Sequence, residues 1–181
     1  MNIAHIEKSA NIYGPGERFV IWMQGCSIKC QGCQNQNMLP FEPKNLTTPD
    51  KLISQIESSK PDGVTILGGE PFDQFEEIKE LCTLLHEKDI SIILFSGYSL
   101  NYIQQTQFKT ILSFIDVLIP EPYKKNMRNT SSGIYGSDNQ KLIFLSDRYN
   151  KTDFQTQNFA EIILEPDGSM KIYGFPPDSI I

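Results

Sequence analysis

Short apolar runs alternate with amphipathic segments along most of the chain. The runs at residues 18–24, 64–67, 91–95, 116–119 and 141–145 predict buried strands, because each is short and mostly apolar. Between several of them, apolar residues recur every three or four positions, which predicts helices with one buried face. Strands that alternate with helices are typical of βα units, so the pattern predicts an α/β fold with a parallel sheet.

Capping residues indicate where the helices begin. Thr48 before Pro49 predicts the start of a helix that ends near residue 60. Asp73 with Glu76 three positions later resembles a capping box at the start of a second helix. The apolar stripe of that second helix comprises Phe75, Ile78, Leu81, Cys82 and Leu85. A third helix is expected within residues 100–115. Residues 161–164 and 170–173, joined by a turn at 166–168, predict a small C-terminal β-hairpin.

Three loops follow predicted strands directly: the loop after residue 24, the turn at 68–71 and the pair at 96–97. Parallel α/β sheets place their chemistry at the carboxyl ends of their strands. We therefore expect these three loops to open onto one face of the molecule.

The first of these loops carries Cys26, Cys30 and Cys33 in the spacing C-x3-C-x2-C. Structural zinc sites and ordinary iron–sulfur clusters use four protein ligands, whereas three thiolates suit a 4Fe-4S cluster with one iron left open. A structural zinc site completed by His5, His86 or Cys82 is the alternative. Cys82 lies on an apolar helix stripe, where a free cysteine behaves as a small hydrophobic residue.

The C-x3-C-x2-C spacing followed by Gly68-Gly69-Glu70-Pro71 resembles the radical S-adenosylmethionine (SAM) superfamily. The finer pattern resembles the activating proteins of anaerobic ribonucleotide reductase and related glycyl-radical-enzyme activases. This pattern consists of Gly14-Pro15-Gly16, Gly32 before the third cysteine, Asn35 after it, and the segment at 136–140. The resemblance implies a partial (βα)6-type radical SAM barrel, a 4Fe-4S cluster and SAM as cofactors.

The resemblance also implies roles for particular residues. Cys26, Cys30 and Cys33 would bind the cluster. The residues expected to bind SAM are Gly32, Cys33, Gln34, Gly68, Gly69, Glu70, Pro71, Ser96, Gly97, Asn139 and Gln140. The turn at 68–71 would meet the methionyl amine of SAM, because two glycines permit close approach of a ligand. The same turn could instead be only a strand-to-helix connection, and Asn139-Gln140 only a loop end.

One segment departs from the family pattern, and one charged residue allows two interpretations. The activases carry Asp-Gly after the fourth strand, where this chain has Pro120-Glu121, and their aromatic residue survives as Tyr123. This region lies toward the substrate end of the expected barrel, so the departure concerns the substrate. Arg18 is interpreted either as a solvated charge or as a rim residue that faces a partner.

Composition limits the remaining function classes. The chain has 181 residues and a net charge of −6, which disfavours nonspecific binding to nucleic acid or to an anionic membrane. Its length suits a single radical SAM domain over residues 1–181. Four cysteines, three of them clustered, suit a reducing compartment, so we expect a cytoplasmic protein.

The resemblance implies an enzyme that generates a glycyl radical on a large partner enzyme, with a flavodoxin- or ferredoxin-type electron donor. Little chain follows residue 140 to cover a radical site, which also favours a macromolecular partner. The alternatives are a radical SAM enzyme acting on a peptide or small molecule, and a non-enzymatic zinc or iron–sulfur binding module.

Overall fold

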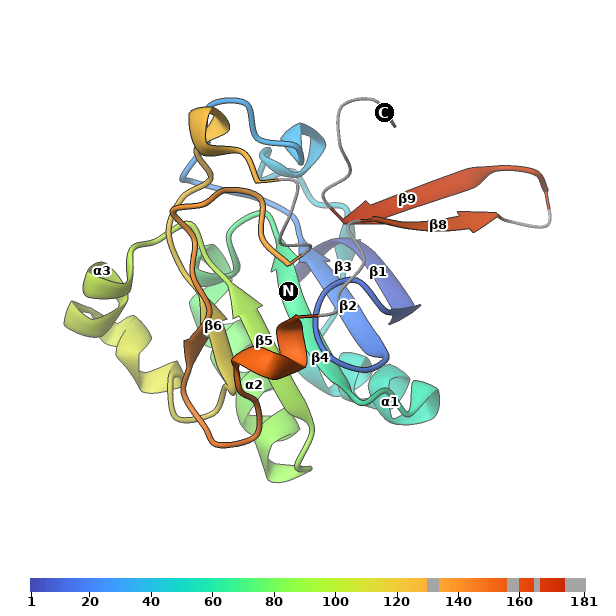
Figure 1. Ribbon diagram of the computed structural model, residues 1–181. Helices are drawn as coiled ribbons and strands as arrows, with labels where there is room; N and C mark the ends of the chain where they lie inside the picture. Colours follow the sequence, from blue (N-terminus) through green and yellow to red (C-terminus); the bar gives the residue numbers. More distant parts are fainter. Residues whose placement is uncertain (130–133, 156–159, 165–166, 175–181) are drawn as a thin grey trace.

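The predicted strands form the centre of one mixed sheet (Figure 1). The computed structural model describes residues 1–129, 134–155, 160–164 and 167–174. Four strands pair in parallel in the order β2 (Arg18–Met23), β4 (Gly63–Gly68), β5 (Ser91–Phe95) and β6 (Val117–Ile119). The strands β1 (Asn2–Ala10) and β3 (Asn45–Leu46) extend one edge, and β7 (Ile143–Phe144) extends the other.

The outer strands correct the expectation of a purely parallel sheet. β1 runs antiparallel to β2, and β7 runs antiparallel to β6. Of the strand predicted at 141–145, only the two residues of β7 pair with β6. The apolar run in the sequence is therefore longer than the strand. A two-stranded sheet of β8 (Ala160–Leu164) and β9 (Met170–Gly174) forms the predicted hairpin. The start of its turn, at 165–166, lies outside the described residues.

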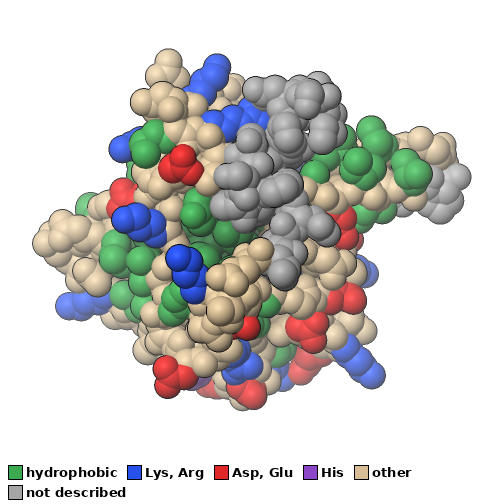
Figure 2. Space-filling view, in the orientation of Figure 1, with side chains coloured by type: hydrophobic (Ala, Val, Ile, Leu, Met, Phe, Trp, Pro, Cys, Tyr) green, Lys and Arg blue, Asp and Glu red, His purple; other side chains and the backbone are tan. Residues whose placement is uncertain are grey.

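The helices α1 (Pro49–Ser59) and α2 (Phe75–Glu87) cover one face of the sheet. Side chains of a strand alternate between the two faces, so each face has its own core. α1 begins at Thr48, whose hydroxyl accepts from the Lys51 amide, and α2 buries the predicted apolar stripe. Both pack against the face that carries Phe19, Ile21 and Met23 of β2. Val20 and Trp22 face the other side, where the core includes Tyr173 of β9. The hairpin extends from the body on that side and leaves apolar side chains exposed (Figures 1 and 2).

Two helix predictions were wrong in detail. Asp73 does not cap α2: it lies within a 3-10 helix, η2 (Pro71–Gln74), and its carboxylate accepts from Ser27 instead. The helix expected over 100–115 is split at Thr106 into α3 (Leu100–Gln105) and the 3-10 helix η3 (Gln107–Ile111). The Thr106 hydroxyl accepts from the Phe108 amide, which starts a new helical segment at that point. Short 3-10 helices also form η1 (Gln36–Met38), η4 (Lys125–Met127) and η5 (Lys151–Phe154).

Arg18 is neither solvated nor at a rim, so both interpretations of it were wrong. It is fully buried at the start of β2 and donates to Thr65 Oγ1 at 3.1 Å, Ser91 Oγ at 2.8 Å and Tyr149 Oη at 3.0 Å. Burial lowers the pKa of the Arg18 guanidinium, and the Tyr149 hydroxyl partly offsets that shift. Arg18 therefore links three strands at the end of the sheet opposite their carboxyl ends.

Within the described ranges, no helix combines the length and apolar character needed to cross a bilayer.

Candidate cofactor site

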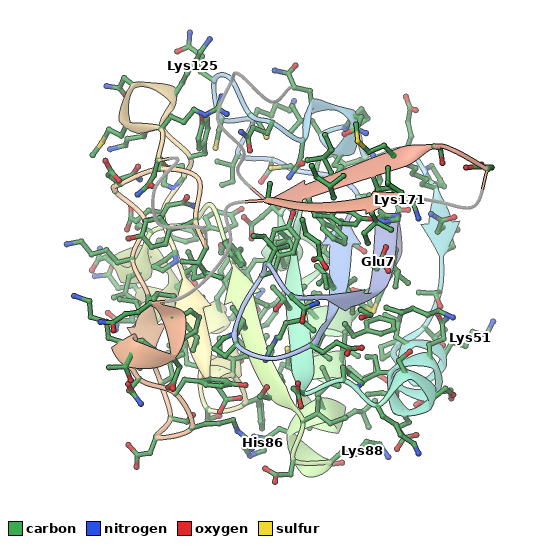
Figure 3. All side chains as sticks on the ribbon, turned by 45° about the vertical axis from the view of Figure 1, so that its right-hand side comes forward. Glu7, Lys51, His86, Lys88, Lys125 and Lys171 are labelled. Carbon is green, nitrogen blue, oxygen red and sulfur yellow. The ribbon has the colours of Figure 1, made fainter. Side chains whose placement is uncertain are left out.

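A pocket at the carboxyl ends of β2, β4 and β5 brings together most of the predicted site residues, as the parallel strands require. The predicted residues that line it are Cys26, Cys30, Cys33, Gln34, Gly68, Gly69, Glu70, Ser96, Gly97 and Gln140. The three loops that follow these strands therefore converge, as expected from the pattern of strands and helices. Lys125, labelled in Figure 3, projects from η4 at this end of the molecule.

The cysteine loop is held by backbone hydrogen bonds to the segment that follows it. The Gly25 amide donates to Met38 O at 2.8 Å, and the Cys26 amide donates to Leu39 O at 3.1 Å. Cys26 is buried, whereas Cys30 and Cys33 are partly exposed. The Asn35 amide donates to Cys33 Sγ at 3.4 Å.

The donor set fits an iron–sulfur cluster. Three free thiols line one pocket, and none of His5, His86 or Cys82 lines it. Among the described residues, no three Cys, His, Asp or Glu side chains are close enough to hold a single metal ion. The thiolates of a four-iron cluster bind different irons, so they need not approach one another so closely. Burial raises the pKa of the Cys26 and Cys30 thiols, so cluster binding must displace their protons.

The two glycines of the 68–71 turn lie close against the backbone at the end of β2 and the start of the cysteine loop. An added Cβ on Gly69 would lie 2.2 Å from Gly25 O, and one on Gly68 would lie 2.6 Å from the Met23 amide nitrogen. Gly68 also has a φ of +103°, which favours glycine. The Gly69 amide donates to Met23 O and the Glu70 amide to Gly25 O, both at 2.9 Å. These glycines therefore join the end of β4 to the start of the cysteine loop.

Glu70 links two of the three loops through its side chain. The carboxylate is 1% exposed and accepts from Phe72 N at 3.0 Å, Ser96 Oγ at 2.9 Å and Gly97 N at 2.7 Å. Burial raises its pKa to about 7, and the hydrogen bonds to Phe72, Gly97 and Ser96 oppose that rise. The Glu70 side chain therefore holds the 96–97 loop beside the 68–71 turn.

Three predicted residues do not line the pocket. Gly32, with φ +73°, packs against the side chain of Lys125. Pro71 is buried at the start of η2, and Asn139 donates from Nδ2 to Pro122 O at 2.9 Å. Gln140 does line the pocket, but its amide also joins two loops. Its Oε1 accepts from the Gly136 and Ser137 amides, and its Nε2 donates to Glu121 O at 3.0 Å.

Other residues at the pocket had no assigned cofactor role. Ile28, Asn35, Leu67, Phe95, Glu121, Tyr123 and Gly136 line it. Next to it, the Asp73 carboxylate accepts from Ser27 N at 2.6 Å, from Ser27 Oγ at 2.8 Å and from Tyr98 Oη at 3.3 Å. Ser27 directly follows Cys26, so Asp73 holds the cysteine loop. No local sequence pattern signals this contact, because 46 positions separate its two residues.

Comparison with known proteins defines the class. Residues 12–143 match the family described as the 4Fe-4S single cluster domain, and the chain belongs to that family. It is 34% identical over 151 residues to the anaerobic ribonucleoside-triphosphate reductase-activating protein of Enterobacteria phage T4, covering 78% of this chain and 93% of the phage protein. It is 31% identical over 96 residues to the pyruvate formate-lyase-activating enzyme of Staphylococcus aureus (strain USA300), covering 49% of this chain and 38% of that enzyme. These matches confirm the predicted resemblance and the predicted 4Fe-4S cofactor.

Proposed function

We propose that this protein is a radical SAM enzyme that generates a glycyl radical on a partner enzyme such as anaerobic ribonucleoside-triphosphate reductase. The observation that carries the proposal is the convergence of three thiols, the 68–70 turn and the 96–97 loop on one pocket. The similarity to the phage activating protein over 93% of its length supports the same conclusion.

In this proposal, Cys26, Cys30 and Cys33 would hold a 4Fe-4S cluster, and SAM would bind beside it in the same pocket. The cluster would supply the one-electron reduction of SAM that starts radical chemistry on the partner's glycine. A flavodoxin- or ferredoxin-type protein would supply that electron. The protein itself orients SAM and excludes water.

The loops at 32–34, 68–71 and 96–97, with Asn139 and Gln140, would hold SAM. The Glu70 carboxylate supports this assignment because it keeps Ser96 and Gly97 beside the 68–70 turn. A second, partly buried hydrogen bond joins two residues of the pocket lining, from Gln140 Nε2 to Glu121 O. These hydrogen bonds join residues of the protein itself, so they hold the loops in place without a ligand.

The proposal extends to architecture and location. We assign the fold as a partial (βα)6-type radical SAM barrel in a single domain over residues 1–181. Four adjacent parallel strands with their carboxyl ends toward the pocket support this assignment. A cytoplasmic location is supported by the four free cysteines, since free thiols persist in a reducing compartment.

The test compares four cysteine variants after anaerobic reconstitution. Cys26→Ala, Cys30→Ala and Cys33→Ala should each lose bound iron and SAM cleavage, because each removes a cluster ligand. Cys82→Ala is the matched control, since Cys82 is fully buried within the apolar core. It should keep its iron and lose only about 1 kcal/mol of stability.

A Cys82 variant without iron, or a Cys33 variant with wild-type iron, would contradict the three-ligand assignment. The partner assignment is tested by electron paramagnetic resonance, which detects a glycyl radical on the added reductase. Wild-type SAM cleavage without any radical on the reductase would favour the alternative of a peptide or small-molecule substrate.

A further inference from the structure

One face of the C-terminal hairpin carries four apolar side chains. Residues that are paired across two antiparallel strands project to the same face. The register of β8 and β9 pairs Ile162 with Ile172 and Leu164 with Met170. Ile162, Leu164 and Met170 are 52%, 75% and 56% exposed, and Figure 2 shows apolar side chains gathered on the hairpin. These four residues are here called the outer face.

The opposite face of the hairpin attaches it to the main sheet. Ile163 and Tyr173 on that face pack into the core that contains Trp22. The Glu161 carboxylate accepts from the Asn11 amide at 2.9 Å. These contacts hold the hairpin without the outer face. The solvent side of an antiparallel sheet usually carries polar residues, so an exposed apolar face indicates a binding site.

The hairpin lies beyond the residues that match the 4Fe-4S family, but it adjoins the cofactor pocket. The match ends at residue 143, whereas β8 begins at Ala160. Leu67 and Phe95 line the pocket and also pack in the same core as Tyr173. In Figure 1 the hairpin extends from the end of the sheet toward which β4 and β5 point. A protein that covers the pocket mouth can therefore reach the outer face as well.

The area of the outer face limits what it can bind. Its exposed apolar side chains offer roughly 400 Å², which is the size of a functional surface patch. Two copies of this chain that packed these faces together would bury about 800 Å², whereas a stable specific interface buries roughly 1,200 Å² or more. The outer face is therefore too small to hold a second copy by itself. Its occupant must contact this chain at another place too.

We propose that the outer face binds an apolar patch of the same enzyme whose glycine enters the pocket, an inference that rests on the proposed function. That enzyme contacts the chain at two places, the pocket and the hairpin, which meets the requirement set by the area. The two contacts strengthen each other, because the second forms at a high effective concentration once the first is made. An uncharged outer face suits this role, since the centres of protein interfaces are depleted of charged residues.

The test measures binding of the reconstituted, SAM-loaded protein to purified anaerobic ribonucleoside-triphosphate reductase from the same source, with oxygen excluded. The double variant Leu164→Thr/Met170→Thr changes one cross-strand pair to a residue that suits strands. It should bind the reductase about tenfold more weakly, because two apolar side chains are lost from the interface. SAM cleavage without the reductase should equal that of the wild-type protein, since neither residue lines the pocket.

Lys171→Thr is the matched control, because Lys171 lies next to Met170 in β9 and projects to the opposite face. It should bind the reductase as tightly as the wild-type protein. The fluorescence of Trp22, the one tryptophan of the chain, reports whether the hairpin stays attached, because its ring stacks on Tyr173 at 5.4 Å. If the double variant changes this fluorescence, Ile162→Thr takes its place and should bind about threefold more weakly.

Wild-type affinity in the double variant, with a glycyl radical still formed on the reductase, would overturn this inference and leave the proposed function intact. A wild-type protein that neither binds the reductase nor forms the radical would overturn both. Sedimentation supplies a further outcome. A wild-type dimer that dissociates in the double variant, with no change in reductase affinity, would also overturn the inference, because a second copy would then occupy the outer face.

Discussion

Glu121 shows how a single residue can hold a conformation that its side chain disfavours. Its φ of +86° is fixed by hydrogen bonds from its amide to Tyr98 O and from Gln140 to its carbonyl. A left-handed conformation costs a non-glycine residue about 1–2 kcal/mol.

Glu121→Gly should therefore raise the free energy of unfolding by about 1 kcal/mol, since relief of strain exceeds the added entropy of the unfolded chain. Urea denaturation measures this difference. Glu121→Ala is the control, because alanine keeps the strained φ and removes the hydrogen bond from Leu100. A gain in stability with alanine equal to that with glycine would show that the side chain, and not the backbone, causes the strain.

At the scale of elements, the site depends on the contact between the end of β4 and the loop after β2. Gly69→Ala should destabilise the protein by about 1–3 kcal/mol and reduce iron incorporation, because its Cβ would collide with Gly25 O next to Cys26. Iron analysis and urea denaturation check both effects.

Gly168→Ala offers a contrasting case within the hairpin. Its added Cβ meets no atom within 4 Å, although its φ is +84°. This variant should cost only about 1 kcal/mol for the backbone strain and keep its iron. Unchanged iron content in Gly69→Ala would mean that the cysteine loop tolerates displacement of the β4 turn.

At the scale of the whole molecule, polar contacts attach the hairpin to the main sheet. Tyr173 Oη lies 2.9 Å from His5 Nε2 and donates to Glu7 Oε2 at 2.9 Å, and Gly174 N donates to Tyr13 Oη at 2.7 Å. The His5 ring also packs against the rings of Trp22 and Tyr173, at centroid distances of 5.2 Å and 5.9 Å, and those two rings stack on each other at 5.4 Å. Figure 3 shows the hairpin crossing over β1, with Lys171 above Glu7.

This attachment should weaken in acid. Burial lowers the pKa of His5 below 6.5, opposed by Glu7, so His5 is easier to protonate in the unfolded chain. The unfolded state therefore binds more protons below pH 6.5, and the free energy of unfolding should fall as the pH decreases through that region. Urea denaturation at pH values on either side of 6.5 should show the fall in the wild-type protein and a smaller one in His5→Gln. Equal pH dependence in the two proteins would contradict the role of His5.

Much of the site followed from the sequence because it depends on local order along the chain. Apolar runs at 18–24, 64–67 and 91–95 correctly predicted the strands that deliver the three loops. Parallel pairing then placed their carboxyl ends together. The cysteine spacing and the motifs around it predicted the 4Fe-4S family, which the comparison confirms.

The tertiary structure alone decided which polar groups meet. Arg18 is buried against Ser91, Asp73 holds Ser27 instead of capping a helix, and Glu70 fixes Gly97. These partners are 73, 46 and 27 positions apart in the chain. Periodicity reports which face of an element is buried, but it carries no information about which distant side chain lies opposite. Those pairings are set only when the strands align in register and bring their loops to the same edge of the sheet.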